Sequence, residues 1–306
     1  MTPIYVFGSS NTDMVVKAQK LPGPGETVIG DTFLMNPGGK GANQAIAAAR
    51  LGGSVTFVAK VGNDLFGKQA LQQFQREKIN TAHVKVDPDN PSGVALIGVD
   101  MNGENSIMVA PGSNSHLKKI DVEAALEQNS LPGIALIQLE IPIDTVEYAI
   151  ERCYQQNMKV ILNPAPAQKL NLDVLKHLFV ITPNESEAEL LTGIKITNED
   201  SIMEAAKILL NLGVENVVLT LGSKGAFLFN KSMSKIIPAP PVTPMDTTAA
   251  GDCFNGALAV ALSENYTLEN AIAFACKAAS ISVTRMGAQS SLPTRKEVDE
   301  LYLTVV

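Results

Sequence analysis

The stretch Thr247-Thr-Ala-Ala-Gly251-Asp252-Cys-Phe-Asn-Gly256 combines small residues with one carboxylate. Apolar residues at helical spacing follow from Ala257 to Leu262, so Gly251 and Asp252 are predicted to open a helix. The first turn of a helix has unpaired N–H groups and about half a positive charge, which suits a phosphoryl anion. The carboxylate is either a catalytic base or only a helix cap, because Asp is a preferred capping residue.

A second glycine-rich stretch reads Asn36-Pro-Gly38-Gly39-Lys40-Gly41-Ala-Asn43-Gln44 and leads into an alanine-rich helix predicted over Ala45 to Leu51. Glycines of this kind bring a polar ligand against the backbone. The spacing excludes a Walker A loop, and no dinucleotide-binding G-x-G-x-x-G follows the first predicted strand. A tight strand-to-helix turn is the alternative interpretation.

The segment Thr182-Pro-Asn184-Glu185-Ser-Glu187 lies between a predicted strand and an acidic helix over Glu185 to Leu191. Asn184 and Glu187 are three positions apart and share one face of the first helical turn. Oxygen groups at this spacing suit the hydration shell of Mg²⁺, which keeps several of its waters. Alternatively, Asn184 caps the helix and the glutamates favour its positive end.

Two further polar sites follow predicted strands. Thr220-Leu-Gly222-Ser-Lys224-Gly225 is a glycine-rich turn that could wrap a nucleotide phosphate or ribose, or simply join two strands. Glu140 ends the apolar run from Ala135 to Leu139, which places a carboxylate at a strand edge, although a surface glutamate would look the same.

The elements that must position these residues alternate between short apolar runs and amphipathic segments. The first strand, Ile4 to Phe7, ends at Gly8-Ser-Ser-Asn11-Thr-Asp13, at the edge where open α/β sheets bind ligands. This βα rhythm predicts an α/β fold with a mainly parallel central sheet and helices on both faces. Strands are predicted at 55–59, 134–139, 160–162, 179–181 and 217–221, with helices at 65–78, 144–157, 201–211 and 294–304.

Two segments do not follow this alternation of strands and helices. Residues 14–36 carry Pro22-Gly-Pro-Gly25 and lack helical periodicity, and residues 93–110 read as a hairpin across Asn102-Gly103. Together they predict a small projecting β-sheet, inserted in a single domain that spans residues 1–306.

The amino-acid composition of the chain limits the kinds of molecule that it is expected to bind. The chain has 306 residues, 45% of them hydrophobic, with 31 acidic against 24 basic residues and a formal charge of −7. We find no cluster of basic residues that would track nucleic acid, so an anionic ligand must be held by local groups. We expect no signal peptide and no membrane span, and the three scattered cysteines predict reduced thiols in a cytoplasmic protein.

Taken in order, four segments resemble signatures of the ribokinase-like family of carbohydrate and nucleoside kinases. They are Gly8 to Asp13, Gly38 to Gln44, Asn184-x-x-Glu187 and Asp246 to Asp252, and the likeness covers essentially the whole chain. The resemblance implies that Asp252 is the general base. It also implies that nine further residues bind the sugar: Asn11, Thr12, Asp13, Gly39, Lys40, Gly41, Ala42, Asn43 and Glu140.

The resemblance implies sites for nucleotide and cations as well. ATP would be contacted by Asn184, Thr220, Leu221, Gly222, Ser223, Lys224, Gly225, Gly251, Asp252 and Cys276. A monovalent cation, usually K⁺, would lie near Asp246, Thr248, Ser282, Arg285, Gly287 and Ser291. Glu187 would hold Mg²⁺ through water.

The implied reaction is ATP-dependent phosphorylation of D-ribose at O5, giving D-ribose 5-phosphate and ADP, with backbone N–H groups of Ala249 to Asp252 as the anion hole. The projecting strands would close over the sugar and join two subunits in a homodimer. Two alternatives remain: a kinase of deoxyribose, a ketose or a nucleoside, and a catalytically silent sugar-binding regulator on the same fold.

Overall fold

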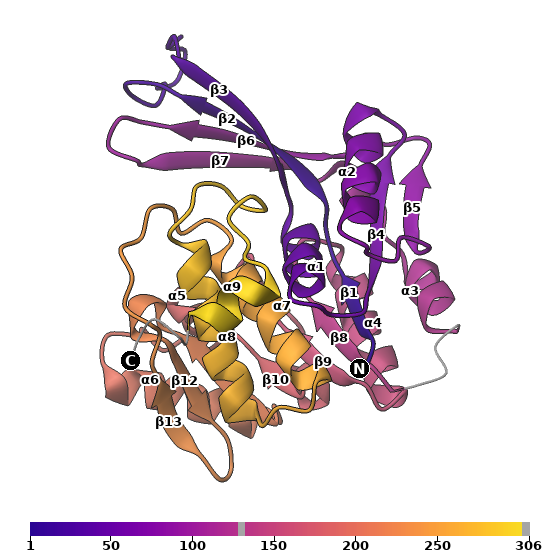
Figure 1. Ribbon diagram of the computed structural model, residues 1–306, viewed down its shortest axis with the longest axis vertical. Helices are drawn as coiled ribbons and strands as arrows, with labels where there is room; N and C mark the ends of the chain where they lie inside the picture. The colour runs from indigo at the N-terminus through magenta and orange to yellow at the C-terminus, as the bar shows by residue number, and fades with distance from the viewer. Residues whose placement is uncertain (128–131, 302–306) are drawn as a thin grey trace.

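The computed structural model describes residues 1–127 and 132–301 and contains two β-sheets, one large and one small (Figure 1). The large sheet has nine strands in the order β13-β12-β11-β10-β9-β8-β1-β4-β5. Its strands are β1 (Ile4–Phe7), β4 (Val55–Gly62), β5 (Val84–Asp87), β8 (Ile134–Ile137), β9 (Lys159–Leu162), β10 (Val180–Ile181), β11 (Asn216–Thr220), β12 (Ala226–Phe229) and β13 (Ser234–Ile237).

The pairing confirms the predicted mainly parallel sheet. All pairs from β5 to β11 are parallel, whereas β12 and β13 pair antiparallel at one edge. In a parallel sheet the carboxyl ends of the strands share one edge, so the loops that follow β1 and β8 meet there. The edge strands β5 and β13 were not predicted, because each is short and largely exposed and so lacks a continuous apolar run.

Helices cover both faces of this sheet, as predicted. Side chains that alternate along β1 separate into two cores: Ile4 and Val6 pack on one face and Phe7 on the other. The first core includes residues of α1 (Lys40–Arg50), α2 (Leu65–Arg76), α7 (Ala250–Ser263), α8 (Leu268–Ser282) and α9 (Arg295–Glu300). The second includes residues of α3 (Lys119–Leu126), α4 (Ile143–Gln155), α5 (Glu185–Thr192) and α6 (Glu199–Asn211).

The predicted helices over 65–78, 144–157 and 201–211 correspond to α2, α4 and α6 with small shifts at their ends. The helix predicted over 294–304 is α9, and its positions after Leu301 lie outside the described residues. Short 3₁₀ turns connect the larger elements at Gly112–His116, Leu172–His177 and Gly222–Lys224. Across the described ranges, no helix has the length and hydropathy needed to cross a bilayer.

The small sheet, here called the lid, has the strand order β3-β2-β6-β7 and projects beyond the large sheet (Figure 1). Its strands are β2 (Asn11–Lys17), β3 (Thr32–Gly38), β6 (Gly93–Val99) and β7 (Asn105–Ala110). The hairpin at 93–110 was predicted well, but the segment at 14–36 was predicted too short. Asn11 pairs with Gly38 across β2 and β3, so the lid strands continue down to the main body.

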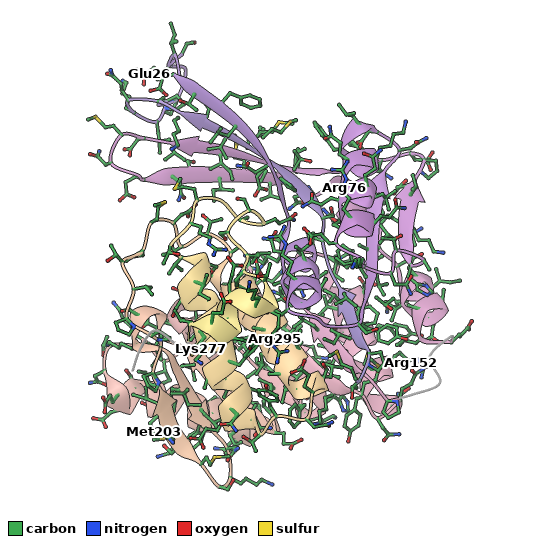
Figure 2. All side chains as sticks on the ribbon, viewed as in Figure 1. Glu26, Arg76, Arg152, Met203, Lys277 and Arg295 are labelled. Atoms are coloured by element: carbon green, nitrogen blue, oxygen red, sulfur yellow. The ribbon has the colours of Figure 1, made fainter. Side chains whose placement is uncertain are left out.

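Much of the lid surface is apolar and exposed. Figure 2 shows side chains on both faces of the lid. The exposed apolar residues of the lid are Val16, Phe33, Leu34, Met35, Leu96, Ile107, Met108 and Val109. An apolar surface of this kind on a projecting sheet is typical of a face that contacts another molecule.

Candidate active site

The predicted site residues converge at the carboxyl edge of the large sheet. Helix α1 begins at Lys40, so the stretch from Lys40 to Gln44 is helical and the predicted start at Ala45 was wrong. The residue before it, Gly39, has φ +90°, and a Cβ there would stand 2.7 Å from the backbone nitrogen of Asn11. Glycine is therefore required where the lid strand, the first loop and α1 meet.

Glu140 is held at the start of α1 and is not a free surface glutamate. Its Oε2 accepts hydrogen bonds from the backbone N–H of Lys40 at 2.9 Å and from the hydroxyl of Ser9 at 2.5 Å. A carboxylate at a helix N-terminus is favoured by the helix dipole, which explains why the α1 start selects an acidic partner. Ser9 was not predicted, although it lies in the polar run after β1.

Asp252 does not cap its own helix. α7 starts at Ala250 with Ala249 as N-cap and no side-chain cap. The Asp252 carboxylate instead accepts 2.9 Å hydrogen bonds from two amides of α1, with Asn43 Nδ2 on Oδ2 and Gln44 Nε2 on Oδ1. The capping interpretation of this aspartate is wrong, because both its oxygens face another helix.

Close packing of α1 and α7 makes these contacts possible. A Cβ at Gly256 would stand 2.7 Å from the Cβ of Ala47 and 2.8 Å from the backbone oxygen of Gln44. The helices therefore approach at a glycine one turn beyond Asp252, which is only 5% exposed. A carboxylate in this position is shielded from water and surrounded by polar side chains.

Burial and neighbouring charges act in opposite directions on the pKa values of Asp252 and Lys40. Burial raises the pKa of the Asp252 carboxyl, while Lys40 and the amides of Asn43 and Gln44 favour its ionised form and oppose that rise. Burial alone would lower the pKa of Lys40, but nearby carboxylates, led by Asp252 and Glu140, outweigh it and the pKa is raised. Lys40 is thus a stable cation among acidic groups.

Asp13 joins the same cluster from the lid strand β2. Burial, followed by the charge of Glu140, raises the pKa of Asp13 to about 6. Its carboxylate lies over Gly38, where a Cβ would stand 2.2 Å from Oδ2. The free protein therefore holds Asp13 close to its titration point at neutral pH.

Asn11 and Asp13 share one face of β2, but Thr12 does not. Side chains alternate along a strand, so Thr12 faces the other side of the lid. It lines a small hollow together with Asn11 and with Phe66 and Gln69 of α2. Thr12 therefore does not share the face of Asp13, because this segment is a strand with alternating side chains.

Asn114 is a site residue that sequence reasoning missed. Its Nδ2 donates to Asn11 Oδ1 at 2.7 Å, and its Oδ1 accepts from the Ser10 backbone N–H at 2.9 Å. It lies in the 3₁₀ turn directly after the lid hairpin, in the run Gly112-Ser-Asn-Ser, which carries no motif of its own. Only the fold brings it next to Asn11.

A cavity of about 590 Å³ adjoins this polar cluster at the start of α7. Seven of the predicted nucleotide residues line it: Asn184, Thr220, Gly222, Ser223, Gly225, Gly251 and Cys276. Leu221 is buried in the core and neither it nor Lys224 lines the cavity, because the 3₁₀ turn directs them elsewhere. Unpredicted apolar residues complete the wall, including Pro240, Val242, Phe254 and Ala279.

The start of α7 is open toward this cavity. A Cβ at Gly251 would meet no atom within 4 Å, and Ala249 before it has φ +60°, a conformation that L-residues rarely adopt. Strained backbone of this kind is found where a loop must present its N–H groups in a set direction. The backbone at the start of α7 is therefore compatible with an anion hole at Ala249 to Asp252, which stays a prediction.

Asn184 and Glu187 form the capping box that was weighed as the alternative to a metal site. Asn184 Oδ1 accepts from the Glu187 N–H at 2.8 Å, and Glu187 Oε2 accepts from the Asn184 N–H at 2.9 Å. This contact uses one Glu187 oxygen. Burial raises the pKa of Glu187, while Lys40 and the Asn184 backbone lower it.

The predicted monovalent-cation residues come from two segments that touch. Asp246 Oδ2 accepts from the Gly287 N–H at 2.8 Å, and Asp246 Oδ1 accepts from both the backbone and the hydroxyl of Thr248. The hydroxyls of Ser282 and Ser291 donate to nearby carbonyls, and the Arg285 side chain pairs with Glu297. The oxygens that this set offers to a cation are therefore the Asp246 carboxylate, the hydroxyls and the main-chain carbonyls, whereas the Arg285 side chain offers none. Residues 1–127 and 132–301 hold no cluster of three or more His, Cys, Asp or Glu suited to a metal.

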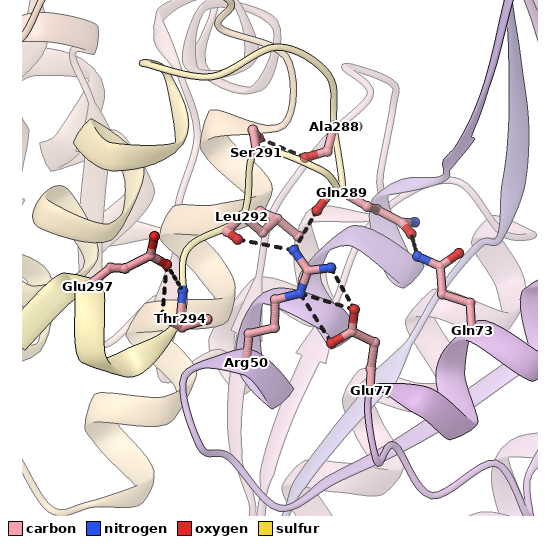
Figure 3. A network of polar contacts seen from close by, with 9 residues as sticks. All are labelled: Arg50, Gln73, Glu77, Ala288, Gln289, Ser291, Leu292, Thr294 and Glu297. Atoms are coloured by element: carbon pink, nitrogen blue, oxygen red, sulfur yellow. Dashed lines mark hydrogen bonds and ion pairs between the residues drawn. The ribbon is translucent and has the colours of Figure 1, made fainter.

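A polar network fixes the loop 288–292 to the main body (Figure 3). The guanidinium of Arg50, at the end of α1, donates to the carbonyls of Gln289 and Leu292 at 2.7 and 3.1 Å and pairs with Glu77. The side chain of Gln289 bonds to Gln73 and donates to the Gly38 carbonyl at 3.4 Å. The segment with the predicted cation residues is thereby tied to the two helices beside the sugar cluster.

The three cysteines are buried and unpaired. Burial raises the pKa of Cys253 to about 12, so a thiolate nucleophile is not favoured there. A larger hollow of about 950 Å³ lies at the opposite edge of the large sheet, beside Lys159 and Asn216. It contains none of the predicted site residues, so size alone does not mark the site here.

Comparison with known proteins agrees with this geometry. The model of the pfkB family carbohydrate kinases matches residues 1–295. The chain is 45% identical over 297 residues to a ribokinase of Haemophilus influenzae, covering 97% of each protein. It is 37% identical to a deoxyribokinase of Salmonella typhi, covering 99% of each.

A solved structure supports the same conclusion. The structure of Arabidopsis thaliana ribokinase complexed with ribose and ATP superposes with a TM-score of 0.89 and 32% identity, covering 98% of each chain. Since the family model spans almost the full length and curated relatives share more than a third of their residues, the chain belongs to the pfkB family of carbohydrate kinases.

Proposed function

We propose that this kinase transfers the γ-phosphoryl group of ATP to O5 of D-ribose, giving D-ribose 5-phosphate and ADP, with Asp252 as general base. One observation carries the proposal: the buried Asp252 carboxylate is hydrogen-bonded to the polar residues of α1, and it directly follows Gly251, which lines the neighbouring cavity. A base at the junction of a polyol site and a nucleotide site can accept a hydroxyl proton as the phosphoryl group moves.

The sugar would be held by the polar cluster. Asn11, Asp13 and Glu140 supply acceptors for a polyol, as does Asn43 Oδ1, which is unpaired among the described residues, and Lys40 supplies donors. The start of α1 carries no large side chain at Gly39, Gly41 and Ala42, so a sugar could approach it closely. A sugar that lacks one hydroxyl would leave a buried polar group unpaired, and this is the source of the expected selectivity.

ATP would occupy the cavity of about 590 Å³, with its phosphates directed toward the N-terminus of α7. Its base and ribose would contact Asn184, the turn from Thr220 to Gly225, and Cys276. Backbone N–H groups from Ala249 to Asp252 would stabilise the charge of the transferring group. Most of the acceleration would come from positioning and charge, with general-base help worth about 10²–10⁴-fold.

Two cations fit the residues present. Mg²⁺ bound to ATP would neutralise phosphate charge, and the Glu187 oxygen not used in the capping box is suited to accept from its waters. A monovalent cation such as K⁺ would be held by Asp246 and main-chain oxygens near Thr248, Ser282, Arg285, Gly287 and Ser291, where it would order the loop before α7. The link between Asp246 and Gly287 supports this pairing of segments.

The acceptor is tested with a panel of ribose, deoxyribose, fructose and adenosine under Mg²⁺-ATP, followed by ADP release, with K⁺ and again with Na⁺ alone. We expect ribose to have the highest kcat/KM. Deoxyribose is the nearest competitor, since a deoxyribokinase is among the relatives. Faster turnover of fructose or adenosine would overturn the assignment.

The Asp252→Asn variant tests the chemistry and the silent-regulator alternative. We expect turnover to fall by about 10²–10⁴-fold while ribose and ATP still bind by calorimetry. A variant with nearly unchanged turnover would remove Asp252 from its role, and a parent protein without turnover on any acceptor would favour the regulator.

The exposed apolar lid supports a homodimer in which the lids of two subunits pair. The lid would also close over the sugar and exclude water. The three buried free thiols fit a reducing compartment, so we place the enzyme in the cytoplasm.

A further inference from the structure

Two buried glutamine side chains link the end of strand β8 to Asp252 through consecutive hydrogen bonds. Gln138, the residue after β8, donates from Nε2 to Gln44 Oε1 at 2.6 Å. Gln44 in turn donates from Nε2 to Asp252 Oδ1 at 2.9 Å. Both glutamines are 0% exposed, so water does not compete for these contacts.

The chemistry of the carboxylate sets the direction of this chain. An ionised Asp252 can only accept, so Gln44 must turn its NH₂ group toward it and its carbonyl oxygen toward Gln138. Gln138 must then present its own NH₂ group to Gln44. The charge on Asp252 therefore determines the orientation of both amides.

Gln138 is packed tightly against the first loop. A Cβ at Gly8, directly after β1, would stand 2.1 Å from Gln138 Oε1, so the Gln138 side chain lies across a position that only glycine permits. The same Oε1 is buried and has no hydrogen-bond partner among the residues that the structure describes. An orphan acceptor destabilises a core, which suggests that Gln138 serves the site and not the stability of the fold.

We propose that Gln44 and Gln138 form a positioning relay, in which Gln44 holds the Asp252 carboxylate in the orientation that accepts the sugar proton and Gln138 acts only through Gln44. The inference rests on the proposed role of Asp252 as general base. Asn43 holds the other carboxylate oxygen, so together the two amides of α1 orient the carboxylate and prevent its rotation.

The relay also favours the ionised form of the base. An N–H donor stabilises a carboxylate and lowers its pKa, so loss of the Gln44 amide would raise the pKa of Asp252. The charged groups that face Asp252 are Lys40 of α1, Glu140 after β8, Asp13 of β2 and Glu187 of α5. These charged groups are unchanged in a Gln44 variant. A shift of the pH profile in that variant would therefore result from the loss of the Gln44 amide.

The test measures kcat, KM and the pH dependence of kcat/KM for Gln44→Leu, Gln138→Leu and the double variant. For Gln44→Leu we expect kcat to fall on the order of tenfold and the acid limb to move up by about one pH unit. Gln138→Leu should also lower kcat and move the acid limb to higher pH, each by a smaller amount. The double variant should match Gln44→Leu, since Gln138 has no route to Asp252 once Gln44 is gone.

Three controls keep the outcomes distinct. Asn216→Leu removes another buried amide, which accepts from Asn230 at 2.8 Å at the opposite edge of the sheet, and should lower Tm without moving the pH profile. Gln44→Met is measured as well, in case Gln44→Leu does not fold. Asp252→Asn is measured in parallel.

The outcomes separate two failures. If a folded Gln44 variant keeps the parent kcat and acid limb while Asp252→Asn has lost turnover, the relay is wrong and the base stands. Additive effects of Gln44→Leu and Gln138→Leu would also overturn it. If Asp252→Asn retains turnover, it is the proposed function that fails.

Discussion

Asn43 and Asp252 lie 209 positions apart in the chain and are joined by a 2.9 Å hydrogen bond between Asn43 Nδ2 and Asp252 Oδ2. The opposite end of the amide, Asn43 Oδ1, is buried and has no partner in the described part of the chain. One side chain thus holds the proposed base and leaves an acceptor free beside it. A sugar hydroxyl that donates to this oxygen would be brought next to Asp252.

Replacement of Asn43 by Leu should therefore weaken ribose binding and slow turnover together. The loss of a buried hydrogen-bond partner costs about 1–3 kcal/mol, which corresponds to about 5- to 150-fold in kcat/KM for ribose. Steady-state kinetics check the effect, and the KM for ATP should change little. An unchanged kcat/KM would mean that the free oxygen does not meet the sugar.

Replacement of Asp13 by Asn should stabilise the free protein above about pH 6. Burial, followed by the charge of Glu140, raises the pKa of Asp13 to about 6, so the folded state disfavours its ionised form at higher pH. As the pH falls through 6 toward 4, Asp13 protonates in the parent and the advantage of the variant shrinks. Thermal unfolding at pH 8, 6 and 5 measures this difference.

Asp31→Asn controls for the loss of one acidic charge, because Asp31 is exposed on the lid. Ribose affinity should fall in Asp13→Asn although the protein is more stable. A Tm gain that did not depend on pH would contradict the explanation.

Replacement of Arg50 by Ala should loosen the loop shown in Figure 3. It removes the donors to the Gln289 and Leu292 carbonyls and leaves Glu77 without its ion pair. We expect a loss of about 1–3 kcal/mol in the free energy of unfolding, measured by urea denaturation. The concentration of K⁺ needed for half-maximal activity should rise, since this loop carries Ser291 and directly follows Gly287, two of the proposed cation residues.

Arg76→Ala is the matched control, because Arg76 is an exposed arginine at the end of α2. It should leave both stability and the K⁺ dependence near those of the parent. Equal effects of the two arginine variants would rule out a specific role for the network.

Replacement of Glu187 by Gln should raise the requirement for Mg²⁺. The glutamine oxygen can still accept from the Asn184 N–H, so the helix cap is preserved and only the charge is lost. Outer-sphere metal partners typically contribute about 10–100-fold in metal affinity or activity. Activity against free Mg²⁺ at fixed ATP measures the shift, with Glu189→Gln, an exposed residue of the same helix that does not line the cavity, as control.

Replacement of Phe33 by Glu should dissociate the proposed homodimer. Phe33 is 60% exposed on β3, and a charge there would have to be desolvated in a lid-to-lid contact. Sedimentation velocity is expected to give a dimer for the parent and a monomer for the variant. Leu65→Glu changes a 63% exposed residue on α2 and should leave the dimer intact. A monomeric parent would contradict the proposal outright.

The sequence by itself determined the fold class and marked segments that the structure brings together around Asp252. Apolar runs alternating with amphipathic helices predicted the parallel sheet, because each strand buried on both faces must be apolar throughout. The polar run after Phe7 and the glycines before Lys40 marked the place where the first loop, the lid and α1 meet closely. Local patterns suffice wherever one element alone sets the position of a residue.

Only the tertiary structure decided which of two candidate side chains caps its helix. The stretch around Asp252 and the one around Asn184 both read as helix caps, yet Asn184 caps its helix and Asp252 contacts α1 instead. The reason is the close approach of α1 and α7 at Gly256, a contact between segments about two hundred positions apart in the chain. The same long-range packing brought in Asn114, Gln138 and Gln289 and turned Thr12 away, because strand pairing and helix contacts are set by the whole core and leave no local signal.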